Sequence, residues 1–223
     1  MTSIPRSALL VALTAGSGAT DALSYLGLGK VFPANMTGNT VLLSIGIATG
    51  DYGRTARSGV ALGGFVFGAL LAGLASRPAD GWTARMRAVL VGEFLVQVAA
   101  LAWWLSLPER HPSGAARFAL IGLLGATMGA QSALVSRLPV GVSTTYITGT
   151  WTAVSTWTAS RLHRGIEPEP RRDAALQVAV VVCYFAAALA AGFLFRVAGG
   201  AVAAIPAAAV AVVLVGSGER GAL

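Results

Sequence analysis

A chain of 223 residues in which 55% are hydrophobic and only 11% are charged does not have the composition of a soluble domain, where about a quarter of residues carry charge. Its mean hydropathy of +0.71, together with apolar stretches of roughly 20 residues, indicates an integral membrane protein. The formal charge of +7 comes from basic residues scattered over short connections, where they bias membrane orientation and form no patch for nucleic acid. The single cysteine, Cys183, excludes an intramolecular disulfide.

The apolar stretches predict six full transmembrane helices, each long enough to cross ~30 Å of hydrocarbon. The first follows Arg6 as the core of a signal peptide would, but it continues to Leu28 and its pattern returns later, so we expect a retained span. In chain order the predicted spans are residues 7–28, 58–76, 88–107, 115–136, 174–197 and 199–216.

Two shorter apolar segments, residues 36–50 and 147–160, each follow a full span after a brief polar or proline-containing stretch. A helix of about 14 residues covers only ~21 Å, which is too short to cross a membrane alone. We therefore expect two short broken or half-helical segments. The predicted fold is an all-α polytopic membrane protein, with residues 1–223 in a single membrane domain.

The second half of the chain repeats the first. Under a shift of 111 positions the matching residues include Arg6 with Arg117, Leu13 with Leu124, Gly18 with Gly129 and Thr37 with Thr148. The order of segments also repeats, as long, short, long, long. This pattern predicts two internal repeats, at about residues 6–107 and 117–218, an organisation common among transporters.

The short segments decide how the repeats are related, and the sequence leaves two alternatives open. If each short segment completes a crossing, each half crosses four times and the repeats are parallel. If each enters and returns to the same face, each half crosses three times and the repeats are inverted. Both alternatives gather most basic residues on the side of the termini, which we expect in the cytoplasm, with the protein in a bacterial inner membrane.

The sequence VFPANMTGNTVLLS, residues 31–44, places a polar, proline-containing stretch where a span would start. Pro33 favours extended backbone before it, and residues 31–35 in extended form cover ~16 Å, about half the depth of the membrane. Thr37 and Asn39 suit the first turn of a following helix. We expect that helix to begin near Thr37 at mid-depth and, in the crossing alternative, to reach the opposite face.

A helix that starts at mid-depth points its free N–H groups and partial positive charge at the membrane centre. The related sequence TTYITGTWTAVS, residues 144–155, would place a second helix start opposite the first. Two facing starts would form a site for a small polar or anionic solute; the alternative is an ordinary interhelical turn near the surface. The predicted substrate-binding residues are Asn35, Thr37, Gly38, Asn39, Gln131, Thr148, Gly149 and Thr150.

The sequence TDALSYLGLGKVFPANMTGNTVLL, with GAQSALVSRL and TTYITGTWT in the second half, resembles the YoaK-type bacterial membrane proteins, a family of unknown function. The resemblance covers essentially the whole chain. Its most specific marks are the Asp21-Ala22 pair and the Asn-Met-Thr-Gly-Asn core that begins at Asn35. It implies a polytopic membrane protein and brings no established substrate.

Asp21 lies within the first span, on a polar stripe with Thr14, Ser17 and Tyr25. A carboxylate at membrane depth is usually turned toward the protein interior or a water-filled cavity. We expect Asp21 to accept hydrogen bonds from the polar stretch near Asn35, as a structural anchor or as a proton- or cation-coupling group. Snorkelling toward water is the third interpretation.

Glu93 lies in the third full span, with Gln97 one turn further on. We predict that it carries protons if it is desolvated, and the alternative is a near-surface glutamate that reaches the interface. Gln131 adjoins Ser132, the position that matches Asp21 under the shift of 111. The duplicated site would therefore be acidic in one half and neutral in the other.

Glycines four residues apart allow helices to approach closely. We expect them to pack within the protein rather than on a dimer face, although a homo-oligomer is left open. The pairs are Gly59/Gly63, Gly64/Gly68 and Gly125/Gly129.

Catalytic and nucleotide-binding signatures are absent from the sequence. His111 and His163 lie in loops, and no zinc motif, nucleophile elbow or phosphate loop occurs. We therefore expect no enzyme, cofactor or metal site. The leading hypothesis is a secondary transporter or facilitator of a small polar or anionic solute, in which Asp21 and Glu93 couple to protons. The alternative is a membrane scaffold or accessory protein, and in both cases membrane lipids surround the chain.

Overall fold

The computed structural model describes residues 5–78, 81–108, 111–139, 143–145, 147–162 and 171–218. Within them every regular element is helical, which confirms the predicted all-α fold. The elements are α1 (Arg6–Gly27), α2 (Met36–Ala48), α3 (Tyr52–Ala75), α4 (Ala84–Ser106), α5 (Gly114–Val135), α6 (Ile147–Leu162), α7 (Arg171–Ala198), the 3₁₀ turn η1 (Gly199–Ala203) and α8 (Ala204–Gly218). His163, predicted in a loop, lies outside the described residues.

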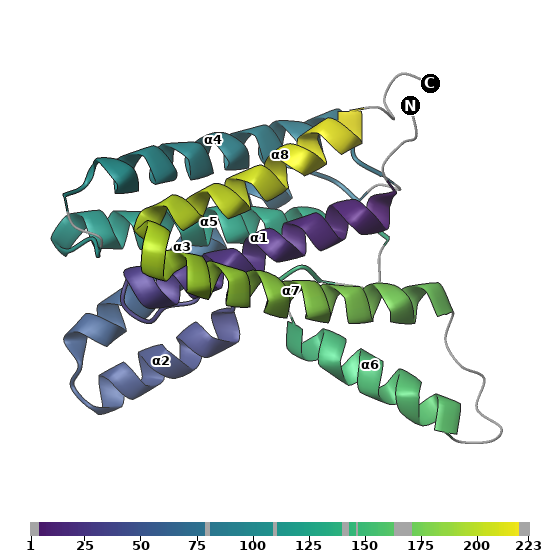
Figure 1. The fold of residues 1–223 in the computed structure, drawn as a ribbon, viewed down its shortest axis with the longest axis horizontal. Coiled ribbons are helices and arrows are strands. Elements are labelled where there is room, and N and C mark those ends of the chain that lie inside the picture. The colour runs from purple at the N-terminus through teal and green to yellow at the C-terminus, as the bar shows by residue number, and fades with distance from the viewer. Residues whose placement is uncertain are drawn as a thin grey trace.

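Among the described residues, five helical stretches are long and apolar enough to cross a membrane: α1, α3, α4, α5 and Ala174–Ser217. The first four correspond to predicted spans. The fifth joins the last two predicted spans and, at 44 residues, is about twice the length that one crossing needs. It covers most of α7 and of α8, which run in opposite directions along the molecule (Figure 1).

The reversal between α7 and α8 takes place at η1. Gly199 has a φ of +55°, which glycine adopts without the strain that a side chain would bring. A Cβ on Gly200 would lie 2.6 Å from the Trp104 ring of α4, so glycine lets the turn approach that ring. Trp104 also contacts Phe195 of α7 edge to face, with ring centroids 6.4 Å apart.

The long helices form one bundle, and α2 and α6 lie along one side of it (Figure 1). α1 is the most deeply buried of the long helices, since 67% of its apolar stretch lies inside the protein, compared with 22% for α3. It packs on α7 and α8, while α5 packs on α3 and α4, and α4 also packs on α8. α2 packs on α3 and α6 packs on α7, so each short helix has one main neighbour.

Glycines bring the α3–α5 and α1–α7 pairs into backbone contact. A Cβ on Gly68 would overlap the Ala126 carbonyl oxygen, and one on Gly129 would overlap that of Phe65. A Cβ on Gly18 of α1 would likewise overlap the Tyr184 carbonyl oxygen of α7. Internal packing is therefore confirmed for these α3 and α5 glycines, where no larger residue fits.

The pair Gly59/Gly63 does not pack in this way, so the expectation of an internal contact is wrong for it. A Cβ on Gly63 would meet nothing within 4 Å, and one on Gly59 would only reach Leu43 at 4.0 Å. The physical reason is the rotation of α3, which turns Gly64 and Gly68 toward α5 and so turns Gly63 away from it.

Both short helices begin near the middle of the molecule and run outward to opposite ends (Figure 1). α2 returns to the end at which α1 finishes and α3 begins, and α6 returns to the end at which α5 finishes and α7 begins. Of the two courses that the sequence left open, α2 follows the one in which the short segment returns toward the end from which it came (Figure 1). The chain enters the bundle and turns back, because residues 28–35 reverse its direction before α2 starts.

Candidate functional site

The chain between α1 and α2, residues 28–35, is called the first break. It turns at Gly29 and Lys30, whose φ angles are +98° and +64°. The Lys30 N–H donates to the Tyr25 carbonyl at 3.1 Å, which closes the end of α1. From α3, Arg57 Nε donates to the Gly29 carbonyl at 3.0 Å. These contacts direct the chain back along the bundle.

Asn39 holds the extended part of the first break. Its Nδ2 donates to the Phe32 carbonyl at 2.7 Å, and its Oδ1 accepts the Phe32 N–H at 3.1 Å. The Asn39 side chain is 0% exposed and thus supplies the backbone partners that Phe32 lacks inside the protein. Its predicted contact with a solute stays a prediction, and its observed role is to fix the break.

α2 starts at Met36, one residue before the predicted start near Thr37. Its cap is Asn35, whose Oδ1 accepts the Gly38 N–H at 3.1 Å, so neither Thr37 nor Asn39 serves as the cap. A Cβ on Gly38 would lie 3.2 Å from the Phe32 ring, which explains a glycine in this first turn. Asn35 and Thr37 are exposed at the open end of the helix.

Asp21 joins three parts of the chain. Its Oδ1 accepts the Ala34 N–H of the first break at 2.7 Å, and its Oδ2 accepts the Tyr184 hydroxyl of α7 at 2.5 Å. The Asp21 side chain is 3% exposed, so it does not snorkel toward water. The expected bond between this carboxylate and the polar stretch is confirmed, with Ala34 as its donor.

The second break, between α5 and α6, is described at residues 143–145 and is held by neutral groups. Gln131 Nε2 donates to Thr144 Oγ1 at 3.1 Å and to Ser17 Oγ of α1 at 2.9 Å. Thr145 Oγ1 donates to Ser132 Oγ at 3.1 Å. Gln131 is 1% exposed, so it lies within the protein as a link between α1, α5 and the second break.

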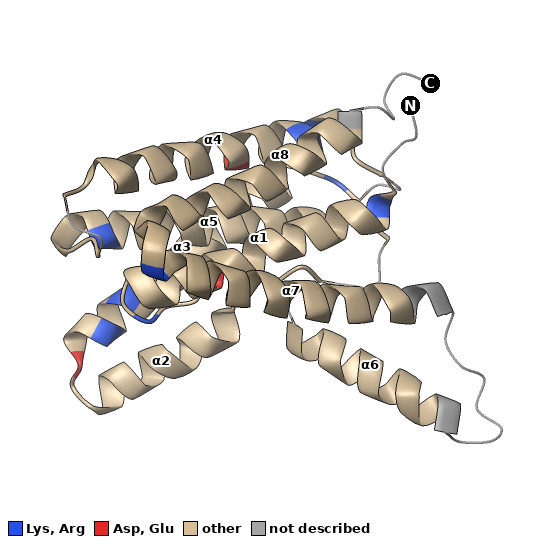
Figure 2. Ribbon diagram, viewed as in Figure 1, with Lys and Arg blue, Asp and Glu red and all other residues tan. Residues whose placement is uncertain are grey.

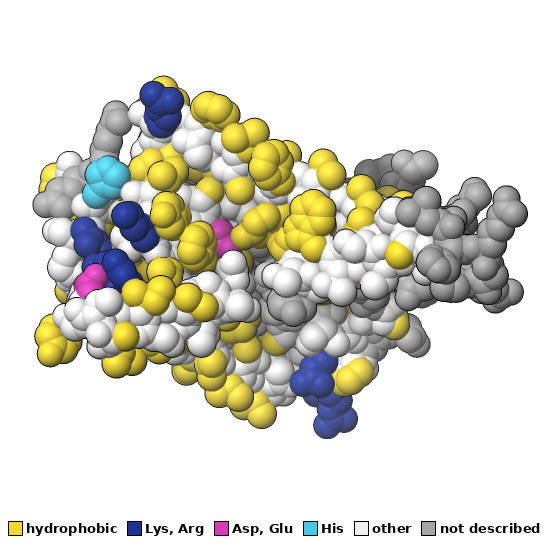
Figure 3. All heavy atoms as spheres, turned by 90° about the horizontal axis from the view of Figure 1, so that it is seen from below, with side chains coloured by type: hydrophobic (Ala, Val, Ile, Leu, Met, Phe, Trp, Pro, Cys, Tyr) yellow, Lys and Arg dark blue, Asp and Glu magenta, His cyan; other side chains and the backbone are white. Residues whose placement is uncertain are grey.

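The open faces of α2 and α6 each carry a row of hydroxyl groups. The exposed members are Thr37, Thr40 and Ser44 on α2, and Thr148, Thr152 and Ser155 on α6. Those beyond the first turn donate to the carbonyl four residues earlier, as in the 2.9 Å bonds of Ser44 to Thr40 and Ser155 to Trp151. Their oxygens remain available as acceptors. Figure 3 shows this side of the molecule, where hydrophobic side chains are scattered over the surface rather than gathered in one patch.

Of the predicted second-half residues, Thr148 is exposed, Gly149 is partly buried and Thr150 is 5% exposed. They form the first turn of α6, as the repeat predicts. The structure thus brings the predicted residues together as two groups, one at the start of each short helix.

Glu93 does not join either group. It lies on α4, is 4% exposed, and lines a cavity with residues of α3 and α5 that includes no other predicted site residue. The near-surface interpretation is wrong, because α4 turns Glu93 toward α5 and not toward its own end. Gln97 Nε2 donates to Glu93 Oε1 at 3.1 Å, as their spacing of one turn allows.

Charged side chains otherwise lie near the two ends of the bundle, as Figure 2 shows for Lys and Arg. This distribution suits a bundle whose long axis crosses the membrane. No group of three His, Cys, Asp or Glu side chains that could hold a metal occurs among the described residues.

The sequence interpretation missed Tyr184, which binds Asp21, and Thr144 and Thr145, which anchor the second break. A signal for Tyr184 existed, since it is a hydroxyl-bearing residue inside an apolar span. Thr145 matches Ala34 under the shift of 111, so the repeat itself pointed to a second anchor.

Comparison with known proteins identifies the family. Residues 9–216 match the family model described as "Protein of unknown function (DUF1275)". The chain is 31% identical over 190 residues to the UPF0700 transmembrane protein YoaK of Bacillus subtilis (strain 168), covering 82% of this chain and 81% of that protein. No solved structure matches. With the apolar helices described above, these matches show that the chain is a membrane protein that belongs to the DUF1275 family.

Proposed function

We propose that this protein is a secondary transporter or facilitator of a small polar or anionic solute, with its path along the open faces of α2 and α6. One observation carries the proposal. The two short helices start near the middle of the bundle and run to opposite ends, each with a row of exposed hydroxyls (Figure 1).

In this proposal the protein consists of two inverted repeats. The full crossings are α1, α3 and α4 in the first half and α5, α7 and α8 in the second, and α2 and α6 re-enter from opposite faces. The packing supports it: α3 packs on α5 as α7 packs on α1, α2 on α3 as α6 on α7, and α4 on α5 as α8 on α1. Each matched helix runs opposite to its counterpart (Figure 1).

The lengths of the short helices are sufficient for a continuous path. The 13 residues of α2 and the 16 residues of α6 extend ~20 Å and ~24 Å. Laid from the middle to opposite faces, they exceed the ~30 Å of hydrocarbon. Thr37 matches Thr148 and Ser44 matches Ser155 under the shift of 111, so both halves of the path would present the same groups.

Electrostatics at the middle of the path favours an anion or a polar solute. The first N–H groups of a helix have no carbonyl partner within it and carry partial positive charge. In α2 the Asn35 side chain takes the N–H of Gly38, which leaves earlier amides at the open end. A solute at this point would accept from amides and, further along, donate to hydroxyl oxygens.

Asp21 is proposed as the proton-coupling group. Both of its oxygens accept hydrogen bonds, from Ala34 and Tyr184. A proton that binds either oxygen removes one of these bonds and weakens the hold on the first break. The coupling role predicted for Glu93 stays a prediction.

The open faces of α2 and α6 also support a homo-oligomer. Each short helix packs on one main neighbour, and Val41, Ile45 and Trp151 are 53%, 41% and 58% exposed. A helix start at mid-depth is not tolerated against lipid, so we propose that a second copy covers this side and encloses the path. Residency in a bacterial inner membrane, with the start of α1 and the end of α8 on the cytoplasmic side, completes the proposal.

The second candidate function is a membrane scaffold or accessory protein. It is favoured by the buried polar groups, since Asp21, Asn39 and Gln131 each bind the chain itself. Under this alternative the breaks serve only to shape the bundle.

Proteoliposome swelling distinguishes the two. Light scattering would follow the entry of glycerol, urea and nitrate into vesicles with and without the protein. We expect at least one of these solutes to enter faster with the wild type, and Thr37→Val combined with Thr148→Val to remove most of the gain. Thr49→Val is the matched control, because Thr49 is exposed, donates to the Ile45 carbonyl at 2.8 Å and lies about 120° around the helix from Thr37.

Two results would reject the transport proposal. One is the same entry rate with and without protein for every solute in the panel, which the scaffold alternative predicts. The other is faster entry that the double threonine variant leaves unchanged, which would place the path elsewhere.

A further inference from the structure

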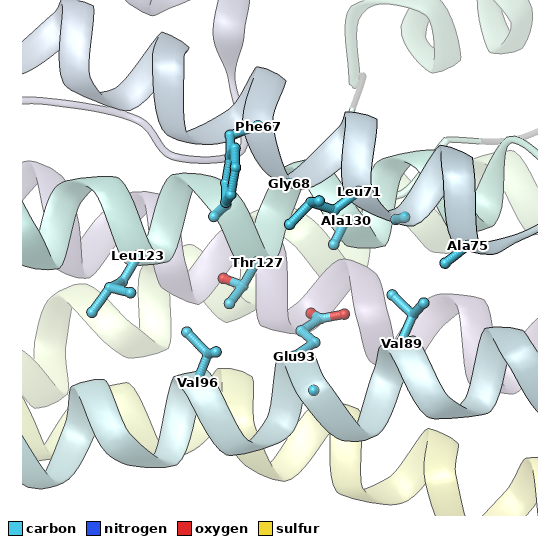
Figure 4. Close-up of a pocket in the computed structure, with 13 residues that line it drawn as sticks. Phe67, Gly68, Leu71, Ala75, Val89, Glu93, Val96, Leu123, Thr127 and Ala130 are labelled. Carbon is cyan, nitrogen blue, oxygen red and sulfur yellow. The ribbon is translucent and has the colours of Figure 1, made fainter.

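A second site lies away from the short helices, in a cavity of about 360 Å³ between α3, α4 and α5. This volume is at the small end of the ~300–1,000 Å³ of ligand pockets. Figure 4 shows side chains from all three helices facing it. The apolar ones include Phe67 and Leu71 of α3, Val89 and Val96 of α4, and Leu123 and Ala130 of α5.

Glu93 presents an unpartnered acceptor in this cavity. Its Oε1 accepts from Gln97, but its Oε2 is buried without a hydrogen-bond partner. Thr127, the other polar side chain of the lining, donates its hydroxyl to the Leu124 carbonyl at 2.9 Å. A buried carboxyl oxygen without a hydrogen-bond partner is costly, and no residue of the lining provides a partner for Oε2.

The shape and chemistry of the cavity define what could supply that donor. The walls are apolar, and Phe67 and Leu71 at the cavity are 59% and 52% exposed on the outer surface of α3. A molecule that enters there comes from the bilayer and must be largely apolar. A carboxylate binds more strongly to a donor that also carries positive charge than to a neutral one.

We propose that this cavity binds a lipophilic ammonium compound, with its apolar part between α3, α4 and α5 and its ammonium group donating to Glu93 Oε2. The occupant reaches the site from the bilayer and not along α2 and α6. The site is therefore independent of the proposed solute path, and either can fail without the other.

Binding of radiolabelled octylamine to the purified protein in lipid nanodiscs at pH 7 tests the proposal, with empty nanodiscs as the blank for partitioning. Octylamine is an ammonium ion at this pH, and 1-octanol is its neutral counterpart. We expect saturable binding that an excess of octanol does not displace. Glu93→Gln should weaken it at least tenfold, because the amide keeps the size of the carboxyl but carries no charge.

Gly92→Leu provides a second variant that leaves the carboxylate in place. Gly92 lines the cavity, and a Cβ there would meet nothing within 4 Å, so a larger side chain can start at this position without a clash at its Cβ. We expect it to abolish octylamine binding. Gly192→Leu on α7 is the matched control, since its Cβ also meets nothing within 4 Å but lies outside this cavity.

A thermal unfolding curve for each variant establishes that it is folded. The proposal is overturned if wild-type binding is not saturable, if octanol displaces octylamine equally well, or if folded Gly92→Leu binds as the wild type does. Binding that survives in folded Glu93→Gln would equally remove the ammonium contact.

Discussion

The two breaks occupy matching positions in the two halves but are held by different chemistry. In the first, the Asp21 carboxylate accepts the Ala34 N–H at 2.7 Å. In the second, Ser132 and Thr145, at the matching positions, are joined through their hydroxyls at 3.1 Å. A neutral pair thus suffices to hold a break in this bundle. The charge of Asp21 has no counterpart in the second break, and this difference is the basis of the proposal that Asp21 couples to protons.

The two halves also share a close contact between helices, although their breaks are held by different groups. Gly18 and Gly129 match under the shift of 111, and each touches a carbonyl oxygen of a neighbouring helix, that of Tyr184 or Phe65. The close approach of α1 to α7 and of α5 to α3 thus rests on the same residue. The two halves thus share these glycine contacts, which form a common framework, whereas the buried carboxylate at the break is present in the first half only.

The largest expected effect concerns the direction of the halves, because it is all or none. In a background with Cys183→Ala, single cysteines replace Tyr52, the first residue of α3 after α2, and Ser160, in the last turn of α6. Inverted repeats place the two on opposite faces, whereas parallel repeats place them on the same face. Tyr52 is 86% exposed, so it is open to reagent.

A membrane-impermeant maleimide on whole cells provides the measurement. We expect Tyr52→Cys to react from outside, and Ser160→Cys to react only after permeabilisation. Labelling of both from one side would contradict the inverted arrangement.

The next effect tests the shared framework. Gly129→Ala places a Cβ against the Phe65 carbonyl, where backbone cannot yield, and we expect it to lower the free energy of unfolding by about 3 kcal/mol. Gly63→Ala is the matched change on an open face, and should raise stability by roughly 0.5–1 kcal/mol. Unfolding in mixed detergent micelles measures both, and similar values for the two would show that α3 and α5 do not touch through Gly129.

The third effect tests the difference between the breaks. Asp21→Ala leaves the buried Ala34 N–H and Tyr184 hydroxyl without their acceptor, at a cost of about 1–3 kcal/mol for each group. Ser132→Ala removes one neutral bond and should cost about 1 kcal/mol. Equal losses in the two variants would mean that the carboxylate holds no more than the hydroxyl does.

Asp21→Asn separates holding from coupling. The amide oxygen can still accept the Ala34 N–H, so stability should fall less than in Asp21→Ala. A proton gradient across proteoliposomes should alter solute entry in the wild type and not in Asp21→Asn. A persistent gradient effect in this variant would assign coupling to another group.

The sequence was sufficient to locate the long helices, but it did not show which face of each helix points into the bundle. Apolar length located α1, α3, α4 and α5, and the cost of a buried acid predicted a donor for Asp21. Tyr184, the partner 163 positions away, reaches Asp21 only because α7 packs on α1. No local sequence pattern predicts that contact. Glu93 illustrates the same limit, because spacing cannot tell whether a helix turns a residue inward or toward its end.

The course of α2 was undecidable from sequence for a different reason. Its length excludes a full crossing, but a short helix that starts at mid-depth can leave by either face. The direction follows from the turn at Gly29 and Lys30 and from Arg57 of α3, which lies 28 positions after the carbonyl it binds. Only the long-range contact shows that the chain turns back.

The smallest expected effect comes from Asp51, the aspartate at the other end of α2. Like Asp21 it accepts a backbone N–H, that of Arg54 at 2.8 Å, and so caps α3. Unlike Asp21 it lies in water. The Arg54 N–H, followed by the charges of Arg54 and Arg57, holds the pKa of Asp51 below its usual value of 3.8.

Because the pKa of Asp51 is lower in the folded protein, its contribution to stability is present above pH 3.8 and is lost as the pH falls through the folded value. Asp51→Asn should therefore unfold slightly more easily than the wild type near neutral pH, and the difference should vanish in acid. Melting temperatures of both proteins across an acid titration measure this. Since water screens the Asp51 charge, a loss as large as that of Asp21→Ala would mean that exposure does not distinguish the two aspartates.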